Sequence, residues 1–497
     1  MFMQVNVLDR YKKMSKPVKA SFWFLVCSFL QKGISIITTP IFTRLLSTQE
    51  YGQFNVFNSW MSILAVVVTL NLSQAIYTQG LIKFSEERNV YTSSLQGLTI
   101  TLVAAWSAIY FLFYNFWNGL FSLTTVQMVA MLVMMWTTAV FNFWAAEQRV
   151  LLNYKRLVIL TLIVSVLKPT LGIILVSISF DKVTARIIGL LIVEIVGYSW
   201  LFVVHMRQGK VFCSGKFWKY ALRLNLPLVP HYLSQIALNS VDRIMIERMI
   251  GASEAGIYSL AYSLSLIMTV FNTALMATLN PWIYLKIQDR KEKEIGNVAY
   301  IALGFVAAVN LLLILFAPEV VRIFAPSTYY EAIYVIPPVA MSVFFLFAYD
   351  FFAKFEFYYE KTQWVAIATV SSALLNIVTN YIFIRMFGYF AAGYTTLTCY
   401  ILYSLFHYVM MKRICKKNMD GSKVFDGRIL FIISLIFVAM GFIFMGLYKL
   451  PLARYILIAI VLVLLIIFRK KLYGVLSIAL KRDKKPTIDL ENDINQE

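Results

Sequence analysis

The stretch RLLSTQEYG, residues 44–52, returns about 200 residues later as RMIGASEAG, residues 248–256. In both copies an arginine opens the stretch, a glutamate is its seventh residue and a glycine closes it. A second match, NYK at 153–155 and YEK at 359–361, has nearly the same offset. Each copy of the first stretch lies between two long apolar segments, so the chain is predicted to consist of two similar halves.

The composition indicates a helical membrane protein. Of the 497 residues, 60% are hydrophobic and 14% are charged, whereas about 25% are charged in a typical soluble domain. Apolar segments long enough to cross a bilayer as helices follow one another along the chain. A transmembrane barrel would instead show segments of roughly 10 residues with alternating polarity. We therefore predict an all-α polytopic membrane protein with about fourteen transmembrane helices. The predicted spans are 20–45, 52–79, 91–116, 122–146, 157–179, 184–205, 218–250, 255–284, 297–317, 333–353, 362–384, 389–411, 429–448 and 452–468.

The repeat divides these spans into two lobes. Six spans per half is an even number, so both halves keep the same orientation, and a pseudo-two-fold axis along the membrane normal relates them. This symmetry predicts a transporter architecture, because two such lobes can open alternately to either side of the membrane. The predicted segments are a cytoplasmic N-terminus (1–19), an N-lobe (20–205, helices 1–6), a cytoplasmic inter-lobe loop (206–217), a C-lobe (218–411, helices 7–12), two extra helices (429–468) and a cytoplasmic tail (469–497).

The charge distribution predicts the orientation. The formal net charge is +20, and most of the 45 Lys and Arg residues fall in the connections on one side of the predicted spans. Cytoplasmic connections of membrane proteins carry such an excess, so both termini are expected in the cytoplasm. The basic charge therefore has an explanation that needs no nucleic acid, and none is expected as a partner.

The seventh span holds an unusual set of polar groups. It contains LPLVPHYLSQIALNSVDRIMIERMIG, residues 226–251, with Pro227 and Pro230 in its first third and Asp242 and Arg243 farther on. Proline kinks a helix, and charges inside a bilayer usually face a cavity or a partner. We interpret the segment as a bent helix, hinged at the prolines, that lines a cavity and carries a charged outer gate. The alternative is a local contact in which Asp242 and Arg243 neutralise each other.

Three charged residues are expected near the middle of the membrane. At 1.5 Å per residue, Lys32 and Lys168 lie roughly 16–18 Å from the inner ends of spans one and five, and Glu194 lies roughly 15 Å below the outer end of span six. Spans five and six are consecutive, so a pair of Lys168 and Glu194 is geometrically possible. Such a pair serves either as a structural ion pair or in substrate binding or proton transfer.

Other charged residues are weaker candidates. Arg44 and Arg248 occupy equivalent outer ends of the repeat and either anchor the interface or flank an outer mouth. Asp350 lies near the inner end of span ten. Together with Glu194 and Asp242 it is a candidate for coupling to an ion gradient, while Lys32, Lys168, Arg243, Arg44 and Arg248 are candidates for binding an anionic head group.

Several stretches resemble polysaccharide transporters. LPLVPHYLSQIALNSVDRIMI (226–246) is similar to their seventh helix and TRLLSTQEYGQFN (43–55) to their first loop. YYEAIYVIPPVAM (329–341) resembles the entry to their tenth helix. The segment 359–396 resembles their eleventh and twelfth helices, with the Asn pair Asn376 and Asn380, and Gly388. The combination is typical of flippases of the Wzx type, which move lipid-linked oligosaccharides such as O-antigen repeat units. These belong to the multidrug/oligosaccharidyl-lipid/polysaccharide exporter superfamily.

The resemblance implies a function. It predicts a flippase that moves an undecaprenyl-diphosphate-linked oligosaccharide from the cytoplasmic to the outer leaflet of a bacterial inner membrane by alternating access, driven by an ion gradient. The implied partners are this lipid-linked substrate, membrane lipids, and polymerase and other polysaccharide assembly proteins. No cofactor, metal or enzymatic activity is expected.

Two other functions stay open on the sequence alone. A drug or metabolite exporter of the same superfamily would share the fold, although the deep basic residues favour an anionic cargo. A membrane-embedded polysaccharide polymerase is the third possibility. It usually needs a large outer loop, and the longest predicted outer connection has roughly 15 residues, between spans nine and ten. No GxxxxGK[ST] motif for ATP is present.

Overall fold

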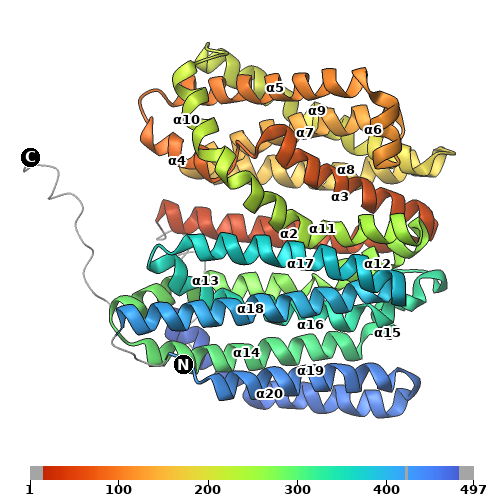
Figure 1. Ribbon diagram of the computed structural model, residues 1–497, viewed down its shortest axis with the longest axis vertical. Helices are drawn as coiled ribbons and strands as arrows, with labels where there is room; N and C mark the ends of the chain where they lie inside the picture. The colour runs from red at the N-terminus through yellow and green to blue at the C-terminus, as the bar shows by residue number, and fades with distance from the viewer. Residues whose placement is uncertain (1–14, 420–423, 481–497) are drawn as a thin grey trace, which may run out of the picture. The chain divides into compact units, whose positions relative to one another are not determined.

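The computed structural model describes residues 15–419 and 424–480, and every regular element within these residues is a helix (Figure 1). The predicted all-α fold is therefore confirmed. Most of the predicted cytoplasmic N-terminus and the end of the predicted tail lie outside the described residues.

The helices of the first half follow the predicted spans closely. Their bounds are α2 (Lys16–Leu45), α3 (Thr48–Thr69), α4 (Ala75–Lys83), α5 (Arg88–Leu112), α6 (Tyr114–Phe121), α7 (Thr125–Val150), α8 (Tyr154–Ile178) and α9 (Lys182–Gly209). Two connections within this half, α4 and α6, are themselves short helices.

The second half continues the pattern and adds the two C-terminal helices. Its elements are α10 (Gly215–Asn225), the 3-10 turn η1 (Leu226–Leu228), α11 (Val229–Met249), α12 (Ala252–Ser265), α13 (Met268–Gln288), α14 (Glu292–Leu315), α15 (Ala317–Phe324), η2 (Ser327–Tyr334), α16 (Ile336–Tyr358), α17 (Thr362–Phe387), α18 (Phe390–Asn418), α19 (Gly427–Gly446), η3 (Leu447–Lys449) and α20 (Pro451–Leu480).

Membrane-spanning length and hydropathy recur along the described residues. Ten of their helical segments are long and apolar enough to cross a bilayer, and Pro451–Ile467 forms a shorter apolar one. Several predicted spans are interrupted, among them 218–250, which the 3-10 turn η1 divides. The span 52–79 breaks after Thr69, where Leu70 and Asn71 adopt positive φ, and 255–284 breaks between Ser265 and Met268. The break at Leu266 and Ile267 is wholly apolar, whereas the one after Thr69 contains Asn71, Ser73 and Gln74 among its five residues.

The repeated stretch at residue 44 contains a helix start. Ser47 accepts a hydrogen bond from the backbone N–H of Glu50, and the Glu50 carboxylate accepts one from the backbone N–H of Ser47. This capping box satisfies two backbone donors that the first turn would leave unpaired. The stretch therefore ends α2 and begins α3 within a few residues.

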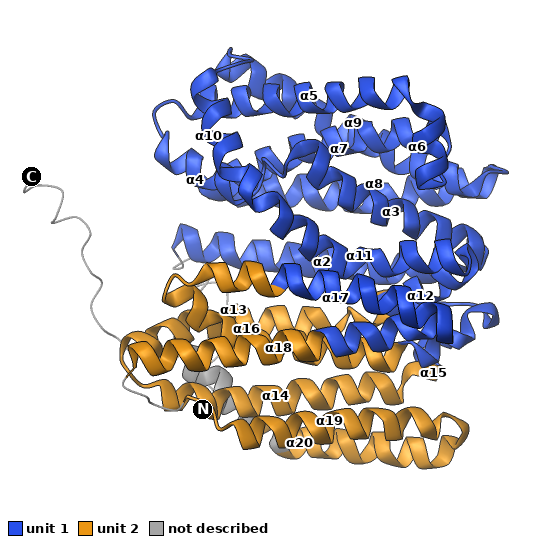
Figure 2. Cartoon of the chain, in the orientation of Figure 1, with its two compact units in different colours: residues 1–262, 319–335, 369–399 blue, residues 263–318, 336–368, 400–497 orange. Residues whose placement is uncertain are grey.

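The chain forms two compact units (Figure 2). Unit 1 comprises residues 1–262, 319–335 and 369–399, and unit 2 comprises residues 263–318, 336–368 and 400–497. In unit 1, α9 packs against α5, α7 and α8, α2 packs along α8, and α3 packs along α11. One core cluster joins Phe57, Met131, Met134 and Ile187, which come from α3, α7 and α9 and are almost fully buried.

Unit 2 is organised around α14 and α16. Helix α14 packs against α13, α16, α19 and α20. Of the 18 consecutive residues that make up the most apolar stretch of α16, 83% are buried inside the protein. Phe344 of this helix meets Phe437 of α19 with their ring centroids 4.3 Å apart, so the C-terminal helix α19 belongs to the core of this unit.

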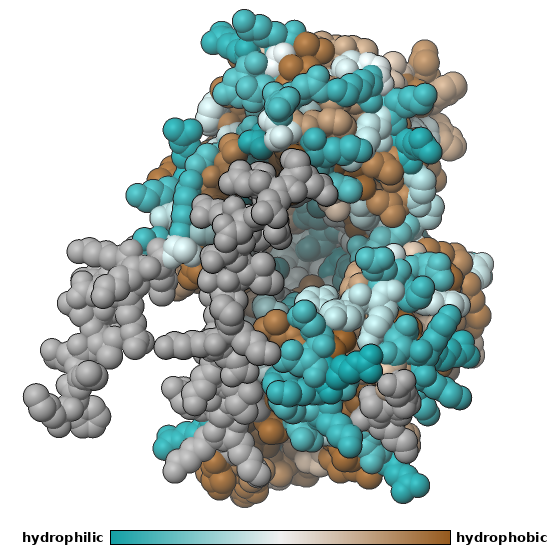
Figure 3. Space-filling model, turned by 90° about the vertical axis from the view of Figure 1, so that its left-hand side faces the viewer, coloured by the Kyte–Doolittle hydropathy of each residue, from teal (hydrophilic) through white to brown (hydrophobic). Residues whose placement is uncertain are grey.

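Exposed apolar side chains mark the lipid-facing surfaces. On α8 these include Ile159, Ile163 and Val166, which a bilayer would cover. Hydrophilic side chains instead gather at the ends of the helices that the charge distribution assigns to the cytoplasm (Figure 3). The chain is accordingly a multi-pass membrane protein.

Candidate functional site

An ion pair joins α8 and α9 at the predicted mid-membrane depth. The Lys168 Nζ donates to Glu194 Oε1 at 2.7 Å. Glu194 Oε2 also accepts hydrogen bonds from Thr137 at 2.7 Å and Thr138 at 3.1 Å. The glutamate is 2% exposed, whereas 28% of the lysine side chain is accessible. The carboxylate is thus held on all sides, and the lysine keeps one accessible face.

Asp242 sits at the centre of a second polar cluster. Its buried carboxylate accepts hydrogen bonds from Tyr258 at 2.7 Å, Asn380 at 2.6 Å and Thr396 at 3.0 Å. These donors come from α12, α17 and α18 and are all uncharged. Asn380 in turn accepts from Thr395 and donates to Asn376 at 3.2 Å. The two asparagines singled out in the sequence therefore belong to the Asp242 network.

Arg243 faces a different environment from its neighbour. Its guanidinium lies 4.5 Å from the ring centroid of Tyr262 and donates to the Asn239 carbonyl at 2.7 Å. The Tyr262 hydroxyl donates to the Asn239 side chain at 3.1 Å. Asp242 and Arg243 therefore have different hydrogen-bonding partners, although Tyr258 and Tyr262 both belong to α12, rather than only neutralising each other.

The prolines of the seventh span mark a break. Pro227 lies in η1, between α10 and α11, and Pro230 is in the first turn of α11. Both side chains are exposed. Proline lacks the N–H that would continue the hydrogen-bond ladder, which accounts for the 3-10 turn at this point. Whether the break acts as a hinge during transport stays a prediction.

The two copies of the repeated stretch touch each other. A Cβ on Gly52 would lie 1.7 Å from the Ala252 carbonyl oxygen, and a Cβ on Gly256 would lie 2.1 Å from the Thr48 carbonyl oxygen. The Thr48 and Ser253 hydroxyls are 2.7 Å apart. The glycines that close both stretches therefore allow α3 and α12 to meet backbone to backbone, in a contact that is nearly the same from either side.

Arg44 and Arg248 extend this contact reciprocally. Arg44 of the first half donates to the Ile323 carbonyl at 3.0 Å, in α15 of the second half. Arg248 of the second half donates to the Leu120 carbonyl, in α6 of the first half. Helices α6 and α15 connect equivalent spans in the two halves. Each arginine therefore hydrogen-bonds to the equivalent outer connection of the opposite half. We call this set of contacts the outer clasp. It comprises Arg44, Thr48 and Gly52 in the first half and Arg248, Ser253 and Gly256 in the second.

The remaining candidates lie apart from these clusters. Lys32 is exposed on α2. Asp350 pairs with Lys354, one turn along α16, at 2.6 Å. Within residues 15–419 and 424–480, the structure contains no group of three His, Cys, Asp or Glu residues that could hold a metal ion.

Sequence reasoning missed two buried carboxylate–histidine pairs. In unit 1, His205 of α9 lies 3.4 Å from Glu147 of α7, and Gln96 contacts the other ring nitrogen at 2.9 Å. In unit 2, His407 of α18 lies 2.7 Å from Glu356 of α16, and both side chains are fully buried. Helices α7 and α9 are the fourth and sixth spans and α16 and α18 the tenth and twelfth, so the repeat itself was the available signal.

The family model for polysaccharide biosynthesis proteins matches residues 18–287, more than half of the chain. The chain belongs to this family. A second model, MatE, matches residues 227–382, which include α11 and most of α17. The two matches together cover α3, α8, α9 and α11, so the ion pair, Asp242 and the outer clasp all lie within family segments.

Similar proteins agree with this assignment. Protein 1 of the Lsg locus of Haemophilus influenzae is 22% identical over 393 residues, which cover 73% of this chain and 90% of that protein. Among solved structures, the lipid II flippase MurJ in an inward closed conformation matches with a TM-score of 0.65 at 15% identity, covering 90% of this chain and 99% of that one. An inward-facing multidrug resistance MATE transporter matches with a TM-score of 0.59 at 15% identity, covering 78% and 96%.

The chain is thus a multi-pass membrane protein of the polysaccharide biosynthesis family, and it shares its helical fold with the MurJ and MATE structures. At these identities the solved structures show the fold alone.

Proposed function

We propose that this family member is a flippase for an undecaprenyl-diphosphate-linked oligosaccharide, which it moves from the cytoplasmic to the outer leaflet by alternating access. The observation that carries the proposal is the Lys168–Glu194 pair. A charge deep in the membrane is costly and usually marks a substrate or ion pathway. Here the carboxylate is enclosed while the ammonium group stays partly accessible, so the accessible partner is the one that attracts an anion.

The chemistry of the pair suits a diphosphate. When an anionic head group approaches, Lys168 can turn from Glu194 toward it without leaving the carboxylate bare, because Thr137 and Thr138 continue to donate to Glu194. In low dielectric, the attraction between a lysine and a phosphate is several times stronger than in water. Lys32, Arg243, Arg44 and Arg248 are the further cations proposed to contact the head group along its path.

Coupling to an ion gradient is assigned to carboxylates. Glu194 is the first candidate, since a proton bound there would release Lys168 for the substrate. Asp242 is the second, because its three hydrogen-bond partners are neutral and a proton would neutralise the carboxylate that they surround. Asp350 is the weakest of the three, because Lys354 already compensates its charge.

A deletion strain tests the proposal. Loss of the flippase should leave lipid-linked repeat units in the cytoplasmic leaflet, where an impermeant glycosidase added to right-side-out vesicles does not reach them. Plasmid-borne wild type should restore access, Lys168→Ala should not, and Lys168→Arg should restore it in part. Lys182→Ala, at the outer end of α9, is the control. Normal flipping by Lys168→Ala at normal expression would reject the anion-binding role.

The proposed location is the bacterial inner membrane with both termini in the cytoplasm. Cys213 lies exposed in the connection between α9 and α10, which the charge distribution assigns to the cytoplasm. An impermeant maleimide should therefore label Cys213 in inside-out vesicles and leave it unlabelled in whole cells. Labelling in whole cells would reverse the proposed orientation.

A second candidate function is export of a drug or metabolite. The MatE match over residues 227–382 favours it. A strain lacking this chain would then become sensitive to cationic compounds while its lipid-linked oligosaccharides were distributed normally. The deletion experiment therefore separates the two functions by its lipid readout.

A further inference from the structure

A basic pocket lies at the inner ends of α2 and α8, and none of its lining residues has a role assigned above. The pocket measures about 560 Å³ and is lined by Lys16, Lys19, Leu152, Asn153, Tyr154, Lys155 and Arg156. Four of these seven residues carry a positive charge, and among the described residues no acidic side chain lines it. A concave surface of this charge is suited to an anion.

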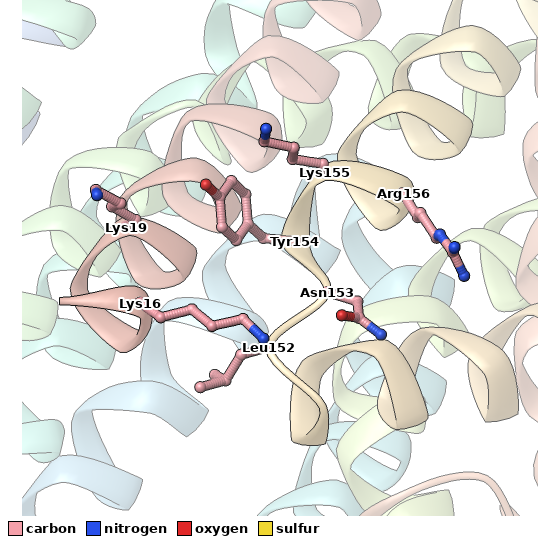
Figure 4. A pocket seen from close by; sticks show the side chains of 7 residues that line it. All are labelled: Lys16, Lys19, Leu152, Asn153, Tyr154, Lys155 and Arg156. Atoms are coloured by element: carbon pink, nitrogen blue, oxygen red, sulfur yellow. The ribbon is translucent and has the colours of Figure 1, made fainter. Parts of the chain in front are cut away.

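The cations come from two separate helices that converge (Figure 4). Lys16 and Lys19 stand on the first turn of α2, and Lys155 and Arg156 on the first turn of α8. Lys16 extends toward the connection between α7 and α8, whereas Arg156 points to the far side of α8. The three lysines therefore supply most of the positive charge that faces the pocket, and Arg156 lies at its edge.

One of the lysines contacts the connection between α7 and α8. The Lys16 Nζ donates to the Leu151 carbonyl at 3.5 Å. Leu151 is the capping residue that follows α7, and a helix C-terminus carries partial negative charge. Farther along the same helix pair, Gln31 of α2 donates to Ser165 of α8 at 3.2 Å. The pocket is thus fixed by the packing of α2 and α8 rather than by flexible side chains alone.

Both helices that form the pocket also present their N-termini to it. Among the described residues, neither of the flanking side chains, Ser15 before α2 and Asn153 before α8, caps its helix. The first backbone N–H groups of α8 are therefore open to another acceptor, and helix N-termini favour phosphate. This backbone contribution adds to the side-chain charge.

The surroundings of the pocket show what kind of anion fits. Phe22, six residues beyond Lys16, is 50% exposed, and Ile159, four residues beyond Lys155, is 59% exposed. At 1.5 Å per residue these apolar side chains begin about 6–9 Å deeper in the membrane. A ligand held here has its charged group among lysines and its neighbouring atoms beside a lipid-facing apolar surface.

We propose that this pocket binds the phosphate group of an inner-leaflet lipid, with the lipid chain lying along α2 and α8. An anionic phospholipid and a polyprenyl diphosphate share this chemistry. The site is separate from the proposed transport path, and its occupancy is an equilibrium property that does not require transport.

Native mass spectrometry of the detergent-purified full chain tests the proposal. The probes are phosphatidylglycerol, undecaprenyl diphosphate, phosphatidylcholine and inorganic pyrophosphate. A basic residue near a membrane surface contributes about 1 kcal/mol toward an anionic lipid, which is roughly fivefold in affinity. The triple variant Lys16→Ala/Lys19→Ala/Lys155→Ala should therefore bind the anionic lipids about 100-fold more weakly than wild type.

Two matched variants keep the test decisive. Arginine at the same three positions keeps the charge and should keep most of the affinity, which shows that the fold is intact. Lys210→Ala/Lys219→Ala removes exposed cations elsewhere on the same side and should leave binding unchanged. Weaker binding of both anionic lipids supports the shared phosphate chemistry, and weaker binding of one identifies that lipid as the source.

Other outcomes would overturn the inference. If the triple alanine variant bound both anionic lipids as wild type does, the pocket would not be the phosphate site. If inorganic pyrophosphate bound as tightly as the lipids, the ligand would be a free phosphate and the lipid assignment would be wrong. Unchanged binding together with failed flipping by Lys168→Ala would reject this inference and leave the proposed function standing.

Discussion

The outer clasp predicts that one methyl group will change the conformational equilibrium. In Gly52→Ala the new Cβ would lie 1.7 Å from the Ala252 carbonyl oxygen, whereas ordinary contacts of this kind begin near 3.4 Å. Backbone, not a flexible side chain, occupies the space, so α3 and α12 must separate by roughly the difference. Overpacking of this kind costs about 1–3 kcal/mol, and in a transporter that cost falls on the state in which the outer ends are closed.

The expected result is a population shift toward the state with open outer ends. A bias of 1–3 kcal/mol corresponds to a change of about 5- to 150-fold in the ratio of two states. The reporter is Thr48→Cys, placed in a background in which the native cysteines are replaced. Thr48 faces Ser253 across the contact, so an impermeant maleimide applied from outside should label it faster in proportion to the open fraction.

Gly119→Ala is the matched control. Gly119 lies in α6, near the same side of the molecule, and a Cβ there would have no heavy atom within 4 Å. Its labelling rate should equal that of the reporter alone. An unchanged labelling rate in Gly52→Ala, with a monodisperse protein at normal yield, would show that the clasp does not separate during transport and would refute the reasoning.

Three further predictions concern the outer clasp, the Asp242 network and the Glu356–His407 pair. Cysteines at Thr48 and Ser253, whose hydroxyls are 2.7 Å apart, should form a disulfide on oxidation, because bonded cysteines need Cβ atoms about 3.5–4.5 Å apart. Flipping should stop in the oxidised protein and return when a reductant is added. Full activity in the oxidised protein would contradict a moving clasp. Asp242→Asn should lower the free energy of unfolding by about 1–3 kcal/mol, because the NH2 group of the new side chain must face a donor where the carboxylate accepted three hydrogen bonds. Thermal unfolding in detergent measures this loss, and an unchanged midpoint temperature would reject the predicted network. His407→Leu should destabilise the protein by about 3–5 kcal/mol, since Glu356 would be left buried and unpaired. The double variant Glu356→Leu/His407→Leu should recover most of this loss of stability. A double variant as unstable as the single one would show that packing, not the pairing, determines the stability.

Most of the helical fold could be predicted from the sequence, because burial in a bilayer demands long apolar segments. The span predicted at 157–179 corresponds to α8, Tyr154–Ile178. The break after Thr69 was missed because Leu70 is apolar and gives no sign of its positive φ, although Asn71, which also adopts positive φ, is a residue type that favours it. Hydropathy reports which residues avoid water and says little about where the backbone leaves the helical conformation.

The candidate site was predicted only where neighbours in sequence are neighbours in space. Lys168 and Glu194 lie on consecutive helices at similar depth, so their pairing followed from spacing. The partners of Asp242 did not, since Asn380 and Thr396 are far away in sequence and a single sequence contains no information on which distant helices pack together. The basic pocket was missed for the same reason, because nothing in the sequence indicated that α2 lies beside α8.

The reciprocity of the outer clasp has a consequence for the origin of the protein. Contacts in which each half gives and receives the same groups are those of two identical subunits paired about a two-fold axis. A six-helix ancestor inserted in one orientation could dimerise in this way, and joining two copies of its gene would need only a linker such as the one before α10. Once fused, the copies were free to diverge. An ion pair on one side and a lone carboxylate among neutral donors on the other is an asymmetry that no homodimer can encode.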